Sequence, residues 1–313
     1  MRVLSIDGGG IRGLIPAIVL ASIEERTGRR VHELFDLIAG TSTGGILACA
    51  LTRPSPLRAA ELAALYEEEG PSIFHRSVVK RLFSVGGLVD ERYEDDGLSA
   101  ALSRYLDDVP LSAALTPIFV TAYDIADRFA FFFRSSRAVA DPSYDFSMVA
   151  CARATAAAPT YFEPVEVTDL AGARTYPLID GGVYAVNPAM CAYADVVSSG
   201  GSVSTLLSLG TGSQIHSYEY SDARWWGQLQ WARPALDMVF DGIADTIEFQ
   251  LGSLLREPGS YLRLQTSLVE ARDAMDDASV ENLRALRREG ERIVRERSSE
   301  IDAVCERLVG ANS

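Results

Sequence analysis

Short hydrophobic runs alternate along the chain with longer segments in which apolar residues recur every three or four positions. The short runs predict buried strands at residues 3–6, 37–39, 117–124, 128–133, 176–180, 204–210 and 261–264. The longer segments predict helices over residues 14–26, 46–52, 55–69, 145–154 and 280–308, a helix that begins near residue 188, and a long amphipathic helix ending near residue 254. Ser55-Pro56 is expected to start the helix over residues 55–69, and Gly70 to close it. Strands that alternate with helices are typical of an α/β fold.

The sharpest local signal is the turn Gly40-Thr41-Ser42-Thr43-Gly44, which lies between a predicted strand and a predicted helix. A serine at the tip of such a turn is forced toward unusual backbone angles, and glycines two residues away let strand and helix pass each other. Its hydroxyl stands near the amino end of the helix, where partial positive charge favours an oxyanion. Ser42 is therefore the predicted nucleophile, and Gly40 and Gly44 shape its elbow. The alternatives are an ordinary glycine-serine turn or a phosphate-binding loop, although the lysine of a P-loop is missing.

A second glycine-rich turn, Asp7-Gly8-Gly9-Gly10-Ile11-Arg12-Gly13, follows the first predicted strand. The glycine spacing formally matches the dinucleotide-binding fingerprint, so a nucleotide site is one interpretation. The next strand, however, does not end in the acidic residue that would hold a ribose. The other interpretation is that the glycines expose backbone N–H groups to a reacting oxygen. Arg12 would add a cation suited to a phosphate or carboxylate of the substrate, or form a surface ion pair.

A third turn follows the strand predicted at residues 176–180, which ends in Asp180-Gly181-Gly182. This places Asp180 at the carboxyl end of a strand, where α/β proteins build their sites. Asp-Gly is also a very common turn, so a structural role is the alternative.

Composition and charge narrow the classes of partner. The formal net charge of −14 argues against nucleic acid as a general partner and requires any contact with an anionic membrane to be local. The four cysteines form no Cys-x-x-Cys pair, and the amino terminus does not resemble a signal peptide, so we expect a cytoplasmic protein that can associate peripherally with membranes. No cluster of histidines and carboxylates has metal-ligand spacing, and we expect neither metal nor cofactor.

Residues 71–96 mix aromatic, basic and then acidic side chains and fit no regular pattern. They are a candidate for a mobile cap or a membrane-facing segment, and an ordinary loop with a short helix is the alternative.

Taken together, the turns at residues 7–13, 40–45 and 180–182 and the run Ala-Thr-Ala-Ala-Ala-Pro-Thr-Tyr-Phe at residues 154–162 resemble the patatin-like phospholipase family. The resemblance implies a three-layer α/β/α sandwich with a mostly parallel central sheet, akin to a modified α/β hydrolase. It implies one catalytic domain over residues 1–313, with the motifs within about 1–212 and a helical part, 213–313, packed on it.

The resemblance also implies the roles of the site residues. Ser42 and Asp180 would form a catalytic dyad, and the oxyanion hole would consist of Gly8, Gly9, Gly10 and Arg12. Gly13, Gly181 and Gly182 would support the motifs. Because none of the three histidines is well placed to complete a triad, Asp180 would act directly as the general base, and burial beside the serine should raise its proton affinity.

The implied function is a serine lipid acyl hydrolase of the phospholipase A or lysophospholipase type, with membrane phospholipids or other acyl glycerolipids as substrate. One alternative is a phospholipase effector of bacterial antiviral defence that a cyclic nucleotide activates, with residues 71–96 as its gate. Another is a nucleotide-binding protein that uses the loop at residues 8–13.

Overall fold

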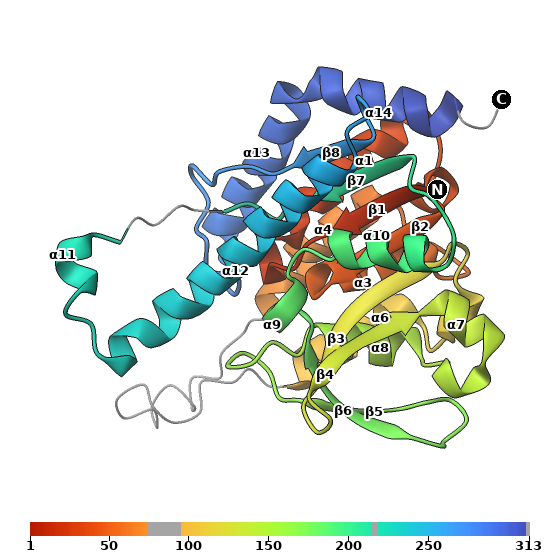
Figure 1. Cartoon of the computed structure of the whole chain (residues 1–313), viewed down its shortest axis with the longest axis horizontal. Helices are drawn as coiled ribbons and strands as arrows, with labels where there is room; N and C mark the ends of the chain where they lie inside the picture. Colours follow the sequence, from red (N-terminus) through yellow and green to blue (C-terminus); the bar gives the residue numbers. More distant parts are fainter. Residues whose placement is uncertain (74–94, 214–217, 311–313) are drawn as a thin grey trace.

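The computed structural model describes residues 1–73, 95–213 and 218–310. They form a mixed sheet of eight strands with helices on both faces (Figure 1). The strands are β1 (Arg2–Ile6), β2 (Leu37–Thr41), β3 (Ile118–Asp124), β4 (Phe129–Arg134), β5 (Val165–Thr168), β6 (Thr175–Asp180), β7 (Thr205–Leu209) and β8 (Tyr261–Leu264). Their order is β5-β6-β3-β2-β1-β7-β8, with β4 paired to β3. The block from β3 to β8 is parallel, whereas β4, β5 and β6 add antiparallel pairs.

Helices cover this sheet on both sides. They are α1 (Leu14–Thr27), α2 (Val31–Leu34), α3 (Thr43–Thr52), α4 (Ala59–Ile73), α6 (Asp95–Leu106), α7 (Ser135–Ala140), α8 (Met148–Thr155), α9 (Gly182–Ala185), α10 (Ala189–Ser198), α11 (Tyr220–Ala223), α12 (Gln228–Leu254), α13 (Val280–Glu296) and α14 (Ser298–Gly310). Short 3₁₀ turns add Gly10–Gly13, Leu111–Ala113 and Pro142–Tyr144.

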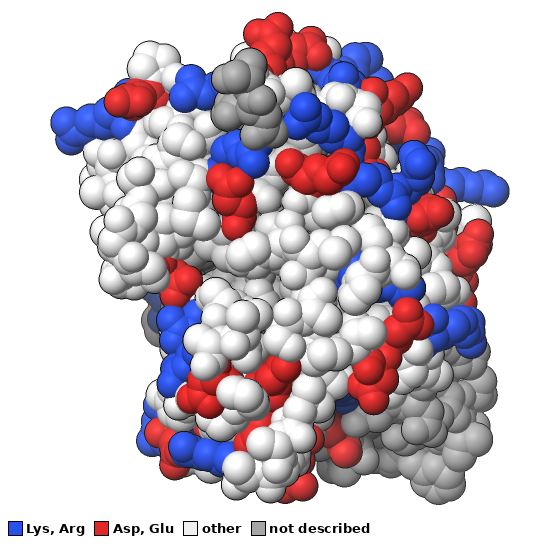
Figure 2. All heavy atoms as spheres, turned by 90° about the vertical axis from the view of Figure 1, so that its right-hand side faces the viewer, with Lys and Arg blue, Asp and Glu red and all other residues white. Residues whose placement is uncertain are grey.

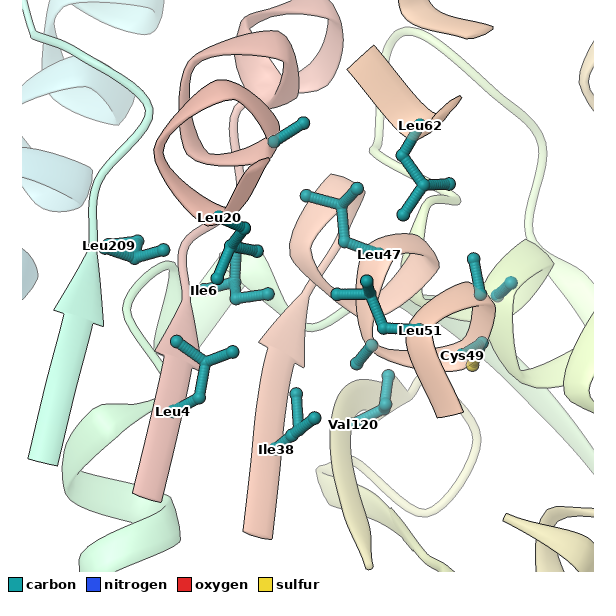
Figure 3. Close-up of a cluster of buried hydrophobic side chains, with 14 of the residues drawn as sticks. Leu4, Ile6, Leu20, Ile38, Leu47, Cys49, Leu51, Leu62, Val120 and Leu209 are labelled. Atoms are coloured by element: carbon teal, nitrogen blue, oxygen red, sulfur yellow. The ribbon is translucent and has the colours of Figure 1, made fainter. Parts of the chain in front are cut away.

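The side chains of β1 alternate between two hydrophobic layers, as the pleat of a strand requires. Leu4 and Ile6 point into the larger layer, together with residues such as Leu20 and Leu47 (Figure 3). Side chains of α1, α3, α4, α8, α13 and α14 belong to this layer. Val3 points into the smaller layer beneath α10 and α12. The predicted three-layer α/β/α sandwich with a mostly parallel sheet is therefore confirmed.

Two helix predictions were wrong, each for a reason of packing. Gly70 does not end its helix, because α4 continues to Ile73; a Cβ at Gly70 would lie 2.5 Å from the Cδ1 of Ile11, so this glycine serves close packing. The single helix predicted over residues 280–308 is broken at Arg297 into α13 and α14, and both pieces pack on α1. β5 was not predicted at all.

The candidate cap at residues 71–96 falls mostly outside the described residues, as do His75 and His216. Within the described ranges, no helix is long and apolar enough to cross a membrane. On the side of the molecule that carries the N-terminus, acidic and basic side chains are interspersed around a largely uncharged area (Figure 2).

Candidate active site

Ser42 occupies the sharp turn between β2 and α3, as predicted. Its backbone angles are φ 55° and ψ −123°, in a region that residues other than glycine rarely adopt. The serine caps the amino end of α3, whose first N–H groups have no partner within the helix. The side chain is half-buried, so the hydroxyl is held at a helix amino end with access from outside.

Close backbone contacts explain the two glycines of the elbow. A Cβ at Gly40 would collide with the carbonyl group of Gly44, and a Cβ at Gly44 would collide with the carbonyl oxygen of Ile6 on the neighbouring strand. Gly13 is required for a related reason, since a Cβ there would meet the hydroxyl groups of Thr43 and Tyr66. The glycines thus allow the strained serine turn to sit directly against β1.

Thr155, at the end of α8, holds the turn in place, and sequence reasoning assigned it no role. The Ser42 N–H donates to Thr155 Oγ1 at 2.8 Å, and the Thr155 hydroxyl donates to the Thr121 carbonyl oxygen at 2.6 Å. The elbow is therefore tied to β3 through one threonine. The only sequence signal for this residue is its place in the small-residue run at 154–162.

The pairing of β3 explains how Asp180 reaches Ser42. One edge of β3 pairs along its length with β4, so β2 and β6 must share the other edge. On that edge Thr121 pairs with Thr41 and the next residue, Ala122, pairs with Asp180. β6 is antiparallel to β3, so Asp180 arrives where β2 stops. The prediction that Asp180 lies at the carboxyl end of a strand is confirmed, whereas no prediction was made of the direction in which that strand runs.

The carboxylate of Asp180 is buried, with 4% of the residue exposed, and contacts two donors. The Gly182 N–H donates to Asp180 Oδ1 at 2.7 Å, and the Ser42 hydroxyl lies beside the carboxylate. Burial raises the pKa of Asp180 to about 7, while the Ser42 hydroxyl and the Gly182 N–H oppose the rise. Gly181 is needed between strand and helix, because a Cβ there would meet the Thr121 side chain.

The glycine-rich turn after β1 lies beside the serine, as a Cβ built at Gly8 would be 3.3 Å from the Cβ of Ser42. The Gly8 N–H already donates to the Val186 carbonyl oxygen at 2.9 Å. The N–H groups of Gly9 and Gly10 have no acceptor among the described residues. The structure thus brings Ser42, Asp180 and the turn together, and it leaves Gly9 and Gly10 as the donors that a ligand oxygen can use.

The remaining features of this turn bear on the nucleotide interpretation. Arg12 lies over the loop, and its Nε donates to the Gly9 carbonyl oxygen at 3.4 Å. A Cβ at Gly9 would collide with Thr211, and one at Gly10 would collide with the carbonyl oxygen of Met275. Gly10, the second glycine of the fingerprint spacing, thus faces a protein segment, whereas in a dinucleotide site that glycine lets the backbone approach the pyrophosphate.

No group of three or more metal-binding side chains lies together in the part of the chain that the structure describes. His32, the one histidine within that part, lies on α2, and burial lowers its pKa. The groups that the site offers for chemistry are the Ser42 hydroxyl, the Asp180 carboxylate and the N–H groups of Gly9 and Gly10.

Comparison with known proteins identifies the family. The profile of the patatin-like phospholipase family matches residues 4–193. The chain is 34% identical to patatin-like protein 2 of Arabidopsis thaliana over 94% of its own length and 83% of the relative's. It is 32% identical to a potato (Solanum tuberosum) protein named probable inactive patatin-3-Kuras 1, over 96% of this chain and 88% of that one. A solved structure, VipD from Legionella pneumophila, aligns with a TM-score of 0.39 at 10% identity, covering 94% of this chain and 67% of that one, which is too slight to carry weight. The chain therefore belongs to the patatin-like phospholipase family, a family of lipid acyl hydrolases.

Proposed function

We propose that the chain hydrolyses fatty-acyl esters of membrane glycerolipids, as a phospholipase A or lysophospholipase, through Ser42 and Asp180. The observation that carries this proposal is a serine in a strained turn whose hydroxyl lies beside a buried carboxylate, the pKa of which burial raises to about 7. An ordinary aspartate is a weak base toward a hydroxyl, whereas a carboxylate with a pKa near the working pH is suited to accept and return a proton.

The first half of the reaction is acyl transfer to the enzyme. Asp180 accepts the proton of the Ser42 hydroxyl as Oγ attacks the ester carbonyl carbon. The carbonyl oxygen gains negative charge, which the N–H groups of Gly9 and Gly10 and the amino end of α3 stabilise. The bond to the leaving alcohol then breaks, and Asp180 donates the proton to that alcohol.

The second half regenerates the enzyme. A water molecule gives a proton to Asp180 and attacks the acyl-serine, forming a second tetrahedral intermediate at the same amides. The fatty acid leaves, and Ser42 Oγ takes back the proton that Asp180 holds. Both halves use one base and one set of donors, and each step conserves protons.

Hydrolysis of defined lipids tests the proposal. Purified protein is incubated with vesicles of dioleoyl phosphatidylcholine, with lysophosphatidylcholine, and with a galactolipid, and the released fatty acids and lysolipids are identified by mass spectrometry. The native chain should release fatty acid from at least one substrate. Ser42→Ala and Asp180→Asn should each lower turnover at least about 10³-fold, with circular dichroism unchanged. A folded Ser42→Ala protein with native turnover would overturn the mechanism.

A further inference from the structure

Segments from the second half of the chain hold the glycine-rich turn after β1. The Thr211 hydroxyl donates to the Gly8 carbonyl oxygen at 2.8 Å. The Ile11 N–H donates to the Met275 carbonyl oxygen at 2.9 Å, from a segment that lies beyond the family match at residues 4–193. The path of the turn, and so the direction of its free amides, depends on contacts with distant parts of the sequence.

A buried ion pair lies at the root of this turn. Arg263 on β8 donates through Nη2 to Asp7 Oδ2 at 2.6 Å, and through Nη1 to the Ser208 hydroxyl at 2.9 Å. The side chains of Asp7 and Arg263 are only 5% and 7% exposed. The Asp7 N–H donates to the Leu209 carbonyl oxygen at 3.0 Å, which prolongs the pairing of β1 with β7 by one residue. Asp7 is the residue immediately before the three glycines.

Stability alone is a weak explanation for such a pair. Removing two charges from water is costly, and well-packed apolar residues often stabilise a fold equally well. Oδ1 of Asp7 has no hydrogen-bond partner among the described residues, so the carboxylate is not even fully satisfied. A buried, directional contact at the last fixed residue before a catalytic loop instead specifies where that loop leaves the sheet.

We propose that Arg263 is a positioning residue for the oxyanion site, which acts through Asp7 to aim the N–H groups of Gly9 and Gly10 at the Ser42 elbow. The proposal rests on the function proposed above and extends the catalytic apparatus to β8. Without Arg263, the turn keeps its sequence and its glycines but loses the contact that fixes its first residue. The transition state should then lose more stabilisation than the bound substrate.

Two variants test this with a soluble monomeric ester, p-nitrophenyl butyrate. Arg263→Met removes the positioning contact, and the double variant Asp7→Asn with Arg263→Met also removes the carboxylate that would otherwise be buried without a partner. In both, kcat should fall about 10- to 100-fold while KM changes less than threefold. The affinity for a trifluoromethyl ketone, whose adduct with serine carries an oxyanion, should fall in parallel with kcat/KM.

The matched control is Arg134→Met, which removes another arginine–aspartate pair, from β4 to Asp195 at 2.8 Å, away from the turn. It should lower the melting temperature and leave kcat within twofold of native. A folded double variant with native kcat and native ketone affinity would overturn the proposal, and so would a double variant that cannot fold, since the pair would then be a requirement of the fold. A native protein without esterase activity would instead count against the proposed function.

Discussion

The site contains two buried aspartates, Asp7 directly after β1 and Asp180 at the end of β6. Their carboxylates contact different kinds of partner. Asp7 and Asp180 are each 4% exposed, and burial raises the pKa of both carboxyl groups. Asp7 contacts the guanidinium of Arg263, whose charge and hydrogen bond oppose that rise. Asp180 contacts a hydroxyl and a backbone N–H, neither of which carries a full charge.

Under the function proposed above, the difference separates a carboxylate that holds a loop from one that moves a proton. An arginine remains protonated at any physiological pH, so a carboxylate in contact with it stays tied to a permanent cation. A carboxylate that faces only neutral donors can gain and lose a proton near neutral pH. The same residue type, at similar burial, is thus suited to hold a loop in one place and to move a proton in the other.

Removing the charge of each aspartate in turn and measuring the free energy of unfolding at pH 8 tests this difference. The pKa of Asp180 is raised from 3.8 to about 7, so the folded chain retains a proton that the unfolded chain has released, and stability falls between about pH 4 and pH 7. At pH 8 the buried charge costs on the order of 4 kcal/mol. Asp180→Asn should therefore be stabilised by up to that amount.

Asp7→Asn should change stability in the opposite direction, losing about 3–5 kcal/mol because Arg263 is left buried without its counter-charge. Denaturant titrations of the three proteins at pH 8 and pH 5 measure both effects. The advantage of Asp180→Asn should shrink to less than half by pH 5, as the native carboxyl group becomes protonated. Shifts of the same sign in the two variants would remove the distinction between the aspartates.

The second test is the pH dependence of ester hydrolysis. With a pKa of about 7, Asp180 is mostly protonated at pH 5 and cannot accept the serine proton, so kcat/KM should fall about 100-fold from pH 8 to pH 5. An aspartate of ordinary pKa would give a nearly flat profile over this range. Asp7→Asn should lower the whole profile without moving its acid limb, because Asp7 exchanges no proton in the reaction. An acid limb near pH 4 in the native protein would show that Asp180 is not the titrating base.

Local sterics explain how much of this site the sequence predicts. Strand and helix cross so closely at this turn that Gly40 and Gly44 have no room for a side chain. Their spacing around Ser42 therefore predicts the elbow directly. The three consecutive glycines at residues 8–10 likewise predict a turn whose backbone is not covered by its own side chains. Each of these signals lies within a few neighbouring residues. The alternation of strands and helices predicts the α/β class, whereas the three-layer arrangement was predicted from the resemblance to a known family.

Contacts between residues that are distant in sequence could not be predicted from such local patterns. Thr155 lies 113 residues from Ser42, and Arg263 lies 256 residues from Asp7. Nothing in a threonine within a small-residue run, or in an arginine on a short strand, indicates which turn it holds. The reversed direction of β6 was also missed, because an aspartate at the end of a strand gives no sign of which neighbour that strand pairs with.

The smallest expected effect concerns the contact that restrains Ser42. Its unusual backbone angles cost energy and persist only where neighbours fix them. Thr155→Val preserves the shape of the side chain but leaves the Ser42 N–H and the Thr121 carbonyl oxygen without this partner, which should cost about 1–3 kcal/mol of stability and lower kcat about tenfold. Thr155→Ser retains the hydroxyl and should stay close to native in kcat. Denaturant titration and ester kinetics on both variants measure these effects. A valine variant with native stability and native kcat would mean that the elbow holds its geometry without Thr155.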